Sequence, residues 1–384
     1  MEIDCPCILE SFGLKTPRGG MNLIGRSMRF TRRRFIGLIL GSLGIAGGTF
    51  FLSKYGGLLR YLVMPPPEAP TKELRESAGN VFSRNGKSLV GIVLGSGGDE
   101  DISEMVRLSV ESIGGVEKAG FKGKKVVVKP NVNSDDTYPA TTNPLVVKGV
   151  IELLYEAGAS EVIVGDMSNP NYPTLDSMRK TGIERAAREA GAEVAAFDDD
   201  EWVTVEPERA EFLKSFEIPR TIYEAERLVN VPAIKTHGIA TYTMSLKNFV
   251  GVIHPRSRWK IHSSDKLEEM IAEISLAVHP NLIVLDGTKS MVSGGPFSGT
   301  VKDTNIILAS GDRVAIDATG LSIIKSFGLW DRVSSKSVWK QKQIRRALEL
   351  NVGRGPREIE IIGRSLVGRE KLKKLIETIE QNII

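Results

Sequence analysis

The fold is decided by one stretch of the chain, which reads KVVVKPNVNSDDTYPATTNPLVVKGVIELLYEAGASEVIVGD over residues 125–166. Residues 125–128 form an apolar, β-branched run that predicts a buried strand, and residues 161–164 predict a second one. Between them, residues 143–157 have the apolar spacing of a helix, which Gly158 ends. A strand, a helix and another strand in this order are typical of a parallel sheet.

The same alternation continues on both sides of this stretch. Further strands are expected at 88–94, 193–197, 227–231, 282–285, 305–308 and 358–362, and helices at 101–118, 174–190, 242–250, 265–278, 314–325, 337–350 and 370–379. Hairpin-like runs interrupt the pattern at 202–223. The sequence therefore predicts an α/β fold with a mainly parallel sheet, helices on both of its faces and a small β insertion near 200–225.

Charge and cysteine content exclude several classes of function. The chain of 384 residues has a formal net charge of +4, but residues 1–64 hold nine Lys/Arg against three Asp/Glu, which leaves the rest slightly acidic. Residues 65–384 therefore lack the excess of basic residues that nucleic-acid binding requires, so no nucleic-acid partner is expected. Both cysteines, Cys5 and Cys7, lie in the basic segment at residues 1–64. Residues 65–384 therefore have no thiolate for zinc or for an iron–sulfur cluster.

The basic segment contains a pattern typical of a twin-arginine export signal. Residues 31–37 read TRRRFIG, with Arg32, Arg33 and Phe35 at the positions that define such signals, and an uncharged run to Ser53 follows. We expect the twin-arginine (Tat) translocase to deliver the protein to the periplasm or to the outer face of the cytoplasmic membrane. No convincing Ala-x-Ala cleavage site follows, so cleavage and retention as a membrane anchor both stay open.

The domain organisation follows from these changes in composition. We expect a basic leader with the twin-arginine motif over 1–34, an apolar signal or anchor over 35–64, a polar linker containing prolines over 65–86, and one α/β domain over 87–384. The alternative for the apolar segment is an ordinary membrane anchor whose basic flank stays inside.

Polar side chains follow several strands of the predicted sheet. They are Lys129-Pro130-Asn131, Gly165-Asp166, Lys235-Thr236-His237 and Asp286-Gly287. In parallel α/β sheets, ligands bind beyond the carboxyl ends of the strands. We therefore predict that Lys129, Asp166, His237 and Asp286 meet at one edge of the sheet and line a shared pocket. The alternative is that they belong to ordinary polar loops.

The histidines are concentrated in one part of the chain. All four, His237, His254, His262 and His279, lie within residues 237–279. Histidine is the common acid–base residue near neutral pH, so His237 and His262, which lie in loops near lysines, are the catalytic candidates, with Lys235 beside them. His254 is expected in a turn and His279 at a helix cap or the surface. Loop histidines that only bond the backbone are the alternative.

A divalent metal is a further expectation. A mixed set of Asp166, His237 and Asp286 could hold such an ion, although their spacing matches no recognised metal signature.

Three lysines predict a site for a small anionic ligand. Lys129, Lys235 and Lys247 each lie next to an apolar element, and Asn131 and Asn248 accompany the first and the third. Lys247 and Asn248 are expected on the edge of the helix at 242–250. Gly294 and Gly295 are expected in a loop that covers the same edge and binds the ligand, or that is merely a turn.

The order of these motifs resembles the family known as Domain of Unknown Function 362. The motifs are Lys129-Pro130-Asn131, Lys235-Thr236-His237, Lys247-Asn248 with Gly251, His262, Asp286-Gly287, Gly294-Gly295-Pro296 and residues 305–317. The resemblance runs from about residue 126 to 327 and implies that these positions belong to one family core. Many members carry ferredoxin-type cysteine clusters, but this chain lacks those cysteines, so no iron–sulfur cluster is expected in it.

The sequence leaves three functions open. The first is an envelope enzyme whose lysines neutralise a small anionic substrate. In this enzyme, His237 or His262 would transfer a proton. Asp166 or Asp286 would orient a histidine or bind a metal. The second is a module that binds or delivers a metal or cofactor without turnover. The third is a structural envelope protein whose polar loops cap the sheet.

Overall fold

The computed structural model describes residues 67–77 and 79–383. The predicted leader, twin-arginine motif and apolar segment lie outside these residues. Within the described part of the chain, no helix combines the length and apolar character needed to cross a membrane.

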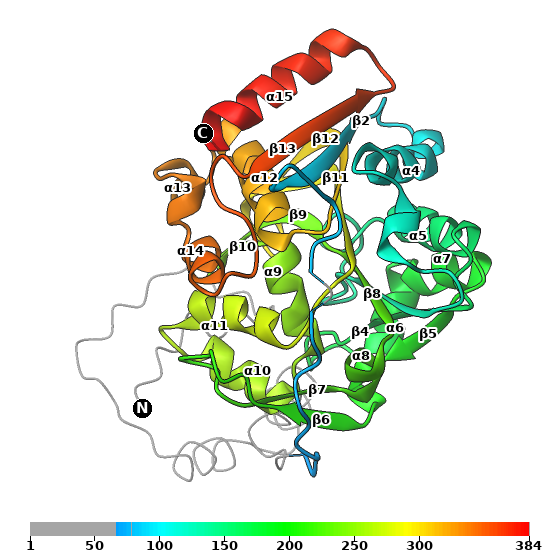
Figure 1. Cartoon of the computed structure of the whole chain (residues 1–384), viewed down its shortest axis with the longest axis vertical. Coiled ribbons are helices and arrows are strands. Elements are labelled where there is room, and N and C mark those ends of the chain that lie inside the picture. The colour runs from blue at the N-terminus through cyan, green and yellow to red at the C-terminus, as the bar shows by residue number, and fades with distance from the viewer. Residues whose placement is uncertain (1–66, 78, 384) are drawn as a thin grey trace, which may run out of the picture.

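A mixed 11-stranded sheet forms the centre of the fold (Figure 1). Its main path runs β1-β2-β12-β11-β8-β3-β4-β5, while β9 pairs with β10 and β11, and β13 pairs with β2. The strands are β1 (Ser83–Arg84), β2 (Lys87–Leu94), β3 (Lys125–Pro130), β4 (Glu161–Asp166), β5 (Glu193–Ala196), β8 (Arg227–Val231), β9 (Ala233–His237), β10 (Thr241–Thr243), β11 (Leu282–Gly294), β12 (Gly299–Ser310) and β13 (Ile359–Ser365).

The half of the sheet from β11 to β5 is parallel throughout. β12 is antiparallel to both β11 and β2, because β11 and β12 form one long hairpin. The predicted α/β class with a largely parallel sheet is confirmed. The hairpin itself was not predicted, since the strands expected at 282–285 and 305–308 cover only the part of each arm that lies away from the turn.

Helices cover both faces of the sheet (Figure 1). They are α4 (Ile102–Ser112), α5 (Pro144–Glu156), α6 (Thr174–Lys180), α7 (Ile183–Glu189), α8 (Arg220–Glu224), α9 (Ser245–Asn248), α10 (Pro255–His262), α11 (Leu267–Glu273), α12 (Arg313–Ser326), α13 (Asp331–Ser334), α14 (Lys342–Glu349) and α15 (Arg369–Ile383).

Two apolar cores result, one on each face. In β3, Val126 and Val128 pack into the core beneath α4, α5 and α7, whereas Val127 packs into the core beneath α9, α11 and α12. Side chains alternate across a strand, so a strand that is apolar at every position is buried from both sides. This accounts for the run of valines from which the fold was predicted.

Two local differences from the sequence-based expectation have physical causes. The expected helix at 174–190 is two helices, because Gly182 adopts a φ of 81° between α6 and α7. The expected helix at 242–250 was wrong over its first residues, since Tyr242 pairs with Thr236 in the antiparallel β9–β10 ladder. The predicted insertion is confirmed as an antiparallel pair, β6 (Trp202–Val205) and β7 (Phe216–Pro219).

Candidate functional site

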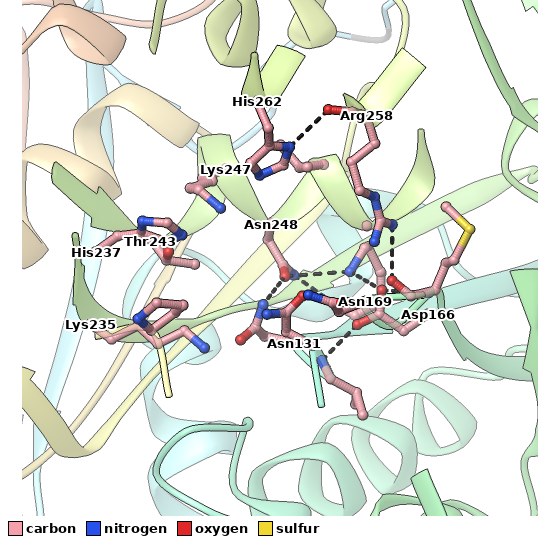
Figure 2. A pocket seen from close by; sticks show the side chains of 17 residues that line it. Asn131, Asp166, Asn169, Lys235, His237, Thr243, Lys247, Asn248, Arg258 and His262 are labelled. Carbon is pink, nitrogen blue, oxygen red and sulfur yellow. Dashed lines mark hydrogen bonds and ion pairs between the residues drawn. The ribbon is translucent and has the colours of Figure 1, made fainter. Parts of the chain in front are cut away.

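A polar cavity of about 40 Å³ lies beyond the carboxyl ends of β3, β4 and β9 (Figure 2). Helices α9 and α10 and the β11–β12 turn also contribute to it. The lining residues are Lys129, Asn131, Val132, Asn133, Asp166, Met167, Asn169, Lys235, His237, Thr243, Lys247, Asn248, Val250, Gly251, Arg258, His262 and Pro296. The structure thus brings together most of the residues that the sequence singled out, at the edge of the sheet where ligands bind in α/β folds.

Lys129 and Asp166 form a buried ion pair at the floor of this cavity. The Lys129 Nζ donates to Asp166 Oδ1 at 2.6 Å, and the exposed fractions of the two side chains are 0% and 3%. The carboxylate also accepts the backbone N–H groups of Val132 and Met167, both at 2.7 Å. Adjacent strand ends of β3 and β4 therefore supply both charges, and both oxygens of Asp166 accept hydrogen bonds from the protein.

Asn248 joins α9 to the strands below it. Its Nδ2 donates to Asn230 Oδ1 at 2.7 Å and to the carbonyl of Lys129 at 3.2 Å, and its Oδ1 accepts from Asn131 Nδ2 at 2.9 Å. This network leaves Asn131 Oδ1 buried without a hydrogen-bond partner in the described part of the protein. Asn248 is therefore a positioning residue, and Asn131 lines the cavity beside it.

Lys235 and Lys247 are buried lysines that form no ion pair with a carboxylate of the described residues. Their exposed fractions are 1% and 8%. Lys235 Nζ donates to the Ala140 carbonyl at 2.6 Å, whereas Lys247 has no hydrogen bond or ion pair with any other described residue. Burial lowers the pKa of each ammonium to about 7, and the charge of Lys235 adds to this effect on Lys247. Both therefore change charge readily near neutral pH.

His237 and His262 are held as opposite tautomers. His237 Nδ1 accepts the backbone N–H groups of Ile239 and Ala240, at 3.2 and 3.3 Å, so the proton is on Nε2. His262, at the end of α10, donates its Nδ1–H to the Arg258 carbonyl at 2.8 Å, because a carbonyl only accepts. Burial lowers the pKa of His237 well below its usual value and that of His262 to about 3. Both rings are therefore neutral near pH 7. They can form hydrogen bonds, but a low pKa does not support either as an imidazolium that transfers its proton to a substrate.

Arg258 is a lining residue that the sequence analysis missed. Its guanidinium donates to the carbonyls of Met167 and Ser168, at 3.0 and 2.9 Å, and its Nε has no partner within the described residues. The sequence feature that could have identified Arg258 is its position one turn before His262 on α10, which places both side chains on the same face of the helix. Thr243 was missed as well, and its hydroxyl is also buried without a described partner.

Asp286 lies outside the cavity, contrary to the prediction. Its carboxylate accepts from the Asn143 backbone at 2.8 Å and from the Thr288 backbone and hydroxyl at 3.0 and 2.6 Å. It therefore links the start of α5 to β11, and burial raises its pKa. The reason for the error is that β11 continues past this residue, so Asp286 is in mid-strand and not at a strand end.

Gly294 and Gly295 do not line the cavity either. They have φ values of 82° and 77° in the turn between β11 and β12, and the Gly295 carbonyl accepts from Gly238 N at 3.2 Å. The turn brings Pro296 to the cavity wall instead. Of the remaining histidines, His254 caps the start of α10 and His279 is half-buried outside the cavity.

The proposed metal set does not fit the geometry. Asp166 is committed to Lys129, Asp286 is absent from the lining, and His237 is surrounded by cations. Among the described residues, no group of three or more His, Cys, Asp or Glu is placed to hold a metal ion. We derive no chemistry through a metal at this site.

A comparison with protein families identifies the same family that the order of the motifs indicates. Residues 126–322, half of the chain, match the family described as a domain of unknown function, DUF362. A thylakoid-associated protein of Synechocystis is 25% identical over 220 residues, and the match covers 55% of this chain and 66% of that protein. The match therefore spans slightly less than two thirds of the relative.

Two solved structures match parts of this chain with low similarity. One, a protein of Thermotoga maritima, is 15% identical with a TM-score of 0.27, and the match covers 49% of this chain and 50% of that one. The other, the lactate racemase apoprotein of Thermoanaerobacterium thermosaccharolyticum, is 9% identical with a TM-score of 0.34, and the match covers 81% of this chain and 90% of that one. Neither similarity bears on function.

Proposed function

The chain belongs to the DUF362 family, and we propose that its cavity binds the anionic group of a small molecule, a carboxylate or a phosphate. The observation that carries the proposal is the charge of the lining. Four cationic residues, Lys129, Lys235, Lys247 and Arg258, surround the cavity, and Asp166 is the one carboxylate among the lining residues. Burying cations without a counter-charge is unfavourable, and an anionic ligand would supply that charge.

The uncommitted donors around the cavity support the same ligand class. Lys247 Nζ, Arg258 Nε and the Nε2–H of His237 have no acceptor among the described residues. The Thr243 hydroxyl is a fourth such group. A carboxylate or phosphate has several oxygens and accepts several charge-assisted hydrogen bonds at once.

The size of the cavity limits what it encloses. Its volume is about 40 Å³, whereas a single buried water needs about 10–15 Å³ by the same kind of measure. The enclosed part of a ligand is therefore a group of a few non-hydrogen atoms. This favours the head group of a small acid over a large cofactor.

Binding would be coupled to protonation. An anion stabilises the charged form of Lys235 and Lys247, whose pKa values burial has lowered to about 7. Since the bound complex holds more protons than the free protein, affinity should be highest below pH 7 and fall as the pH rises.

The place of action is the second part of the proposal. The TRRRFIG pattern at residues 31–37 supports Tat export, with the ligand met outside the cytoplasm and the apolar run after it as a cleaved signal or an anchor. A fusion to a reporter that is active only after export tests this. Replacing Arg32 and Arg33 by Lys should abolish export, and export that persists would contradict the proposal.

Calorimetry and thermal melts of the purified full chain test the anion site. Propionate, lactate, pyruvate and inorganic phosphate should include at least one ligand that raises the melting temperature at pH 6.5, while choline should not. Lys247→Met should lose this stabilisation. Lys302→Met, at an exposed position of β12, is the matched control and should keep it. If none of the anions stabilises the wild type, the proposal is wrong.

A further inference from the structure

Lys247 differs from the other lysines of the cavity in having an uncommitted nitrogen. Lys129 is bonded to Asp166 and to the Pro130 carbonyl at 2.9 Å, and Lys235 is bonded to the Ala140 carbonyl. Lys247 has no such partner in the described part of the chain. Figure 2 shows its side chain pointing into the cavity beside His262 and Thr243.

The position of Lys247 is set by elements that are themselves fixed. It lies on the single-turn helix α9, whose first backbone N–H groups, those of Ser245 and Leu246, donate to the buried Asp317 carboxylate at 2.7 and 3.0 Å. Asn248 anchors the other end of α9 to Asn230. The amine is therefore presented from a rigid base, as a nucleophile requires.

The surroundings also make this amine reactive. Burial, together with the charges of Lys235, Arg258 and Lys129, lowers the pKa of Lys247 to about 7. Near pH 7, about half of the ligand-free molecules then carry a free amine, which is the nucleophilic form; a bound carboxylate lowers this fraction without abolishing it. A solvent-exposed lysine of ordinary pKa is almost wholly protonated at that pH.

We propose that Lys247 forms an imine with the carbonyl group of a 2-oxo acid whose carboxylate occupies the anion site. The inference rests on the proposed function, because it assigns the carboxylate to the cationic lining and adds a carbonyl within reach of the amine. Lys235 and Arg258 would hold the carboxylate, since the third remaining cation of the lining, Lys129, is paired with Asp166.

The step needs no oxidant or reductant. The lone pair of Lys247 Nζ attacks the carbonyl carbon and forms a C–N bond, while the carbonyl π electrons move to oxygen, which takes up a proton as the nitrogen loses one. The resulting carbinolamine then loses its hydroxyl and the remaining proton of its nitrogen as one water molecule, and the C=N bond forms. The His237 Nε2–H and the Thr243 hydroxyl are the uncommitted donors that could stabilise the oxygen as negative charge develops on it.

Borohydride trapping tests the inference directly. The full chain is incubated with pyruvate at pH 7.5, reduced with sodium borohydride, and analysed by intact mass and peptide mapping. We expect one reduced pyruvate adduct per chain, located on Lys247. Lactate, which has the carboxylate but no carbonyl, should give no adduct.

Two variants control for charge and for general lysine reactivity. Lys247→Arg keeps a cation but cannot form the imine, so it should lose the adduct while lactate still raises its melting temperature. Lys302→Arg should keep the adduct. Mapping of the wild-type adduct gives the answer even where a cavity variant fails to fold.

The possible failures separate the two proposals. If lactate and pyruvate both stabilise the chain but no adduct forms, the imine is wrong and the anion site stands. An adduct on Lys235, or one spread over exposed lysines, overturns the assignment to Lys247. If no anion stabilises the chain and no adduct forms, both proposals fail.

Discussion

Replacing Asp166 by Asn removes the carboxylate that pairs with the buried ammonium of Lys129, the one such partner among the described residues. The side chain keeps its size, but the 2.6 Å ion pair is lost and Lys129, with an exposed fraction of 0%, is left without a counter-charge. Removing one partner of a buried pair typically costs about 3–5 kcal/mol. We expect a loss of that order in the free energy of unfolding at pH 7.

The pH dependence of this loss can be worked out from Lys129. The variant can avoid a buried charge by deprotonating the lysine, and burial already lowers its pKa from the ordinary 10.5. For a group of pKa 10.5, deprotonation costs at most about 5 kcal/mol at pH 7 and about 2 kcal/mol at pH 9. The charge-related part of the loss should therefore shrink as the pH rises.

Urea unfolding of wild type and Asp166→Asn at pH 7 and pH 9 measures the effect. The difference between them should fall by about 1–3 kcal/mol over this interval. A second change, Lys129→Met, should recover part of the loss, since it removes the stranded charge. Glu226→Gln, at the exposed pair with Lys124, is the control and should show a much smaller change at both pH values. A loss of the same size at pH 7 and pH 9 would mean that the stranded charge of Lys129 is not its cause.

Three further outcomes are expected. Above pH 7, the affinity for propionate should fall about tenfold per pH unit if binding requires one of Lys235 and Lys247 to be protonated, and about a hundredfold if it requires both. Calorimetric titrations measure this, and an affinity that does not change with pH would contradict it. Gly251→Ala would place a Cβ 2.5 Å from Asp166 Oδ1, so urea melts should show a loss of about 1–3 kcal/mol and anion titrations a weaker site. Glu273→Gln, which removes a buried carboxylate bonded to Arg346 and to three backbone N–H groups, should cost about 2–4 kcal/mol in the same melts. Its affinity for propionate should be unchanged.

The parallel half of the sheet was predictable because its strands are apolar at every position. The valines of β3 and the β-branched run of β4 leave no polar face, which in a chain of this length indicates a strand covered on both sides. The β11–β12 hairpin was not predictable in the same way. The first residues of β12 are exposed and mostly polar, and the pairing of β12 with β11 depends on contacts between residues far apart in sequence.

The cavity was predictable where residues stand directly at strand ends. Lys129 and Asp166 follow that rule, and the structure joins them in one ion pair. Asp286 failed because the strand continues beyond it, and strand length is decided by pairing with β12. Arg258 was missed because its role depends on how α10 packs over the sheet edge, which the helix sequence alone does not state.

The most direct test of the anion site is an anomalous-scattering map of crystals grown in bromide. We expect a strong bromide peak inside the cavity, within hydrogen-bonding distance of Lys247 Nζ and His237 Nε2. Bromide peaks confined to the outer surface, with only water in the cavity, would contradict it.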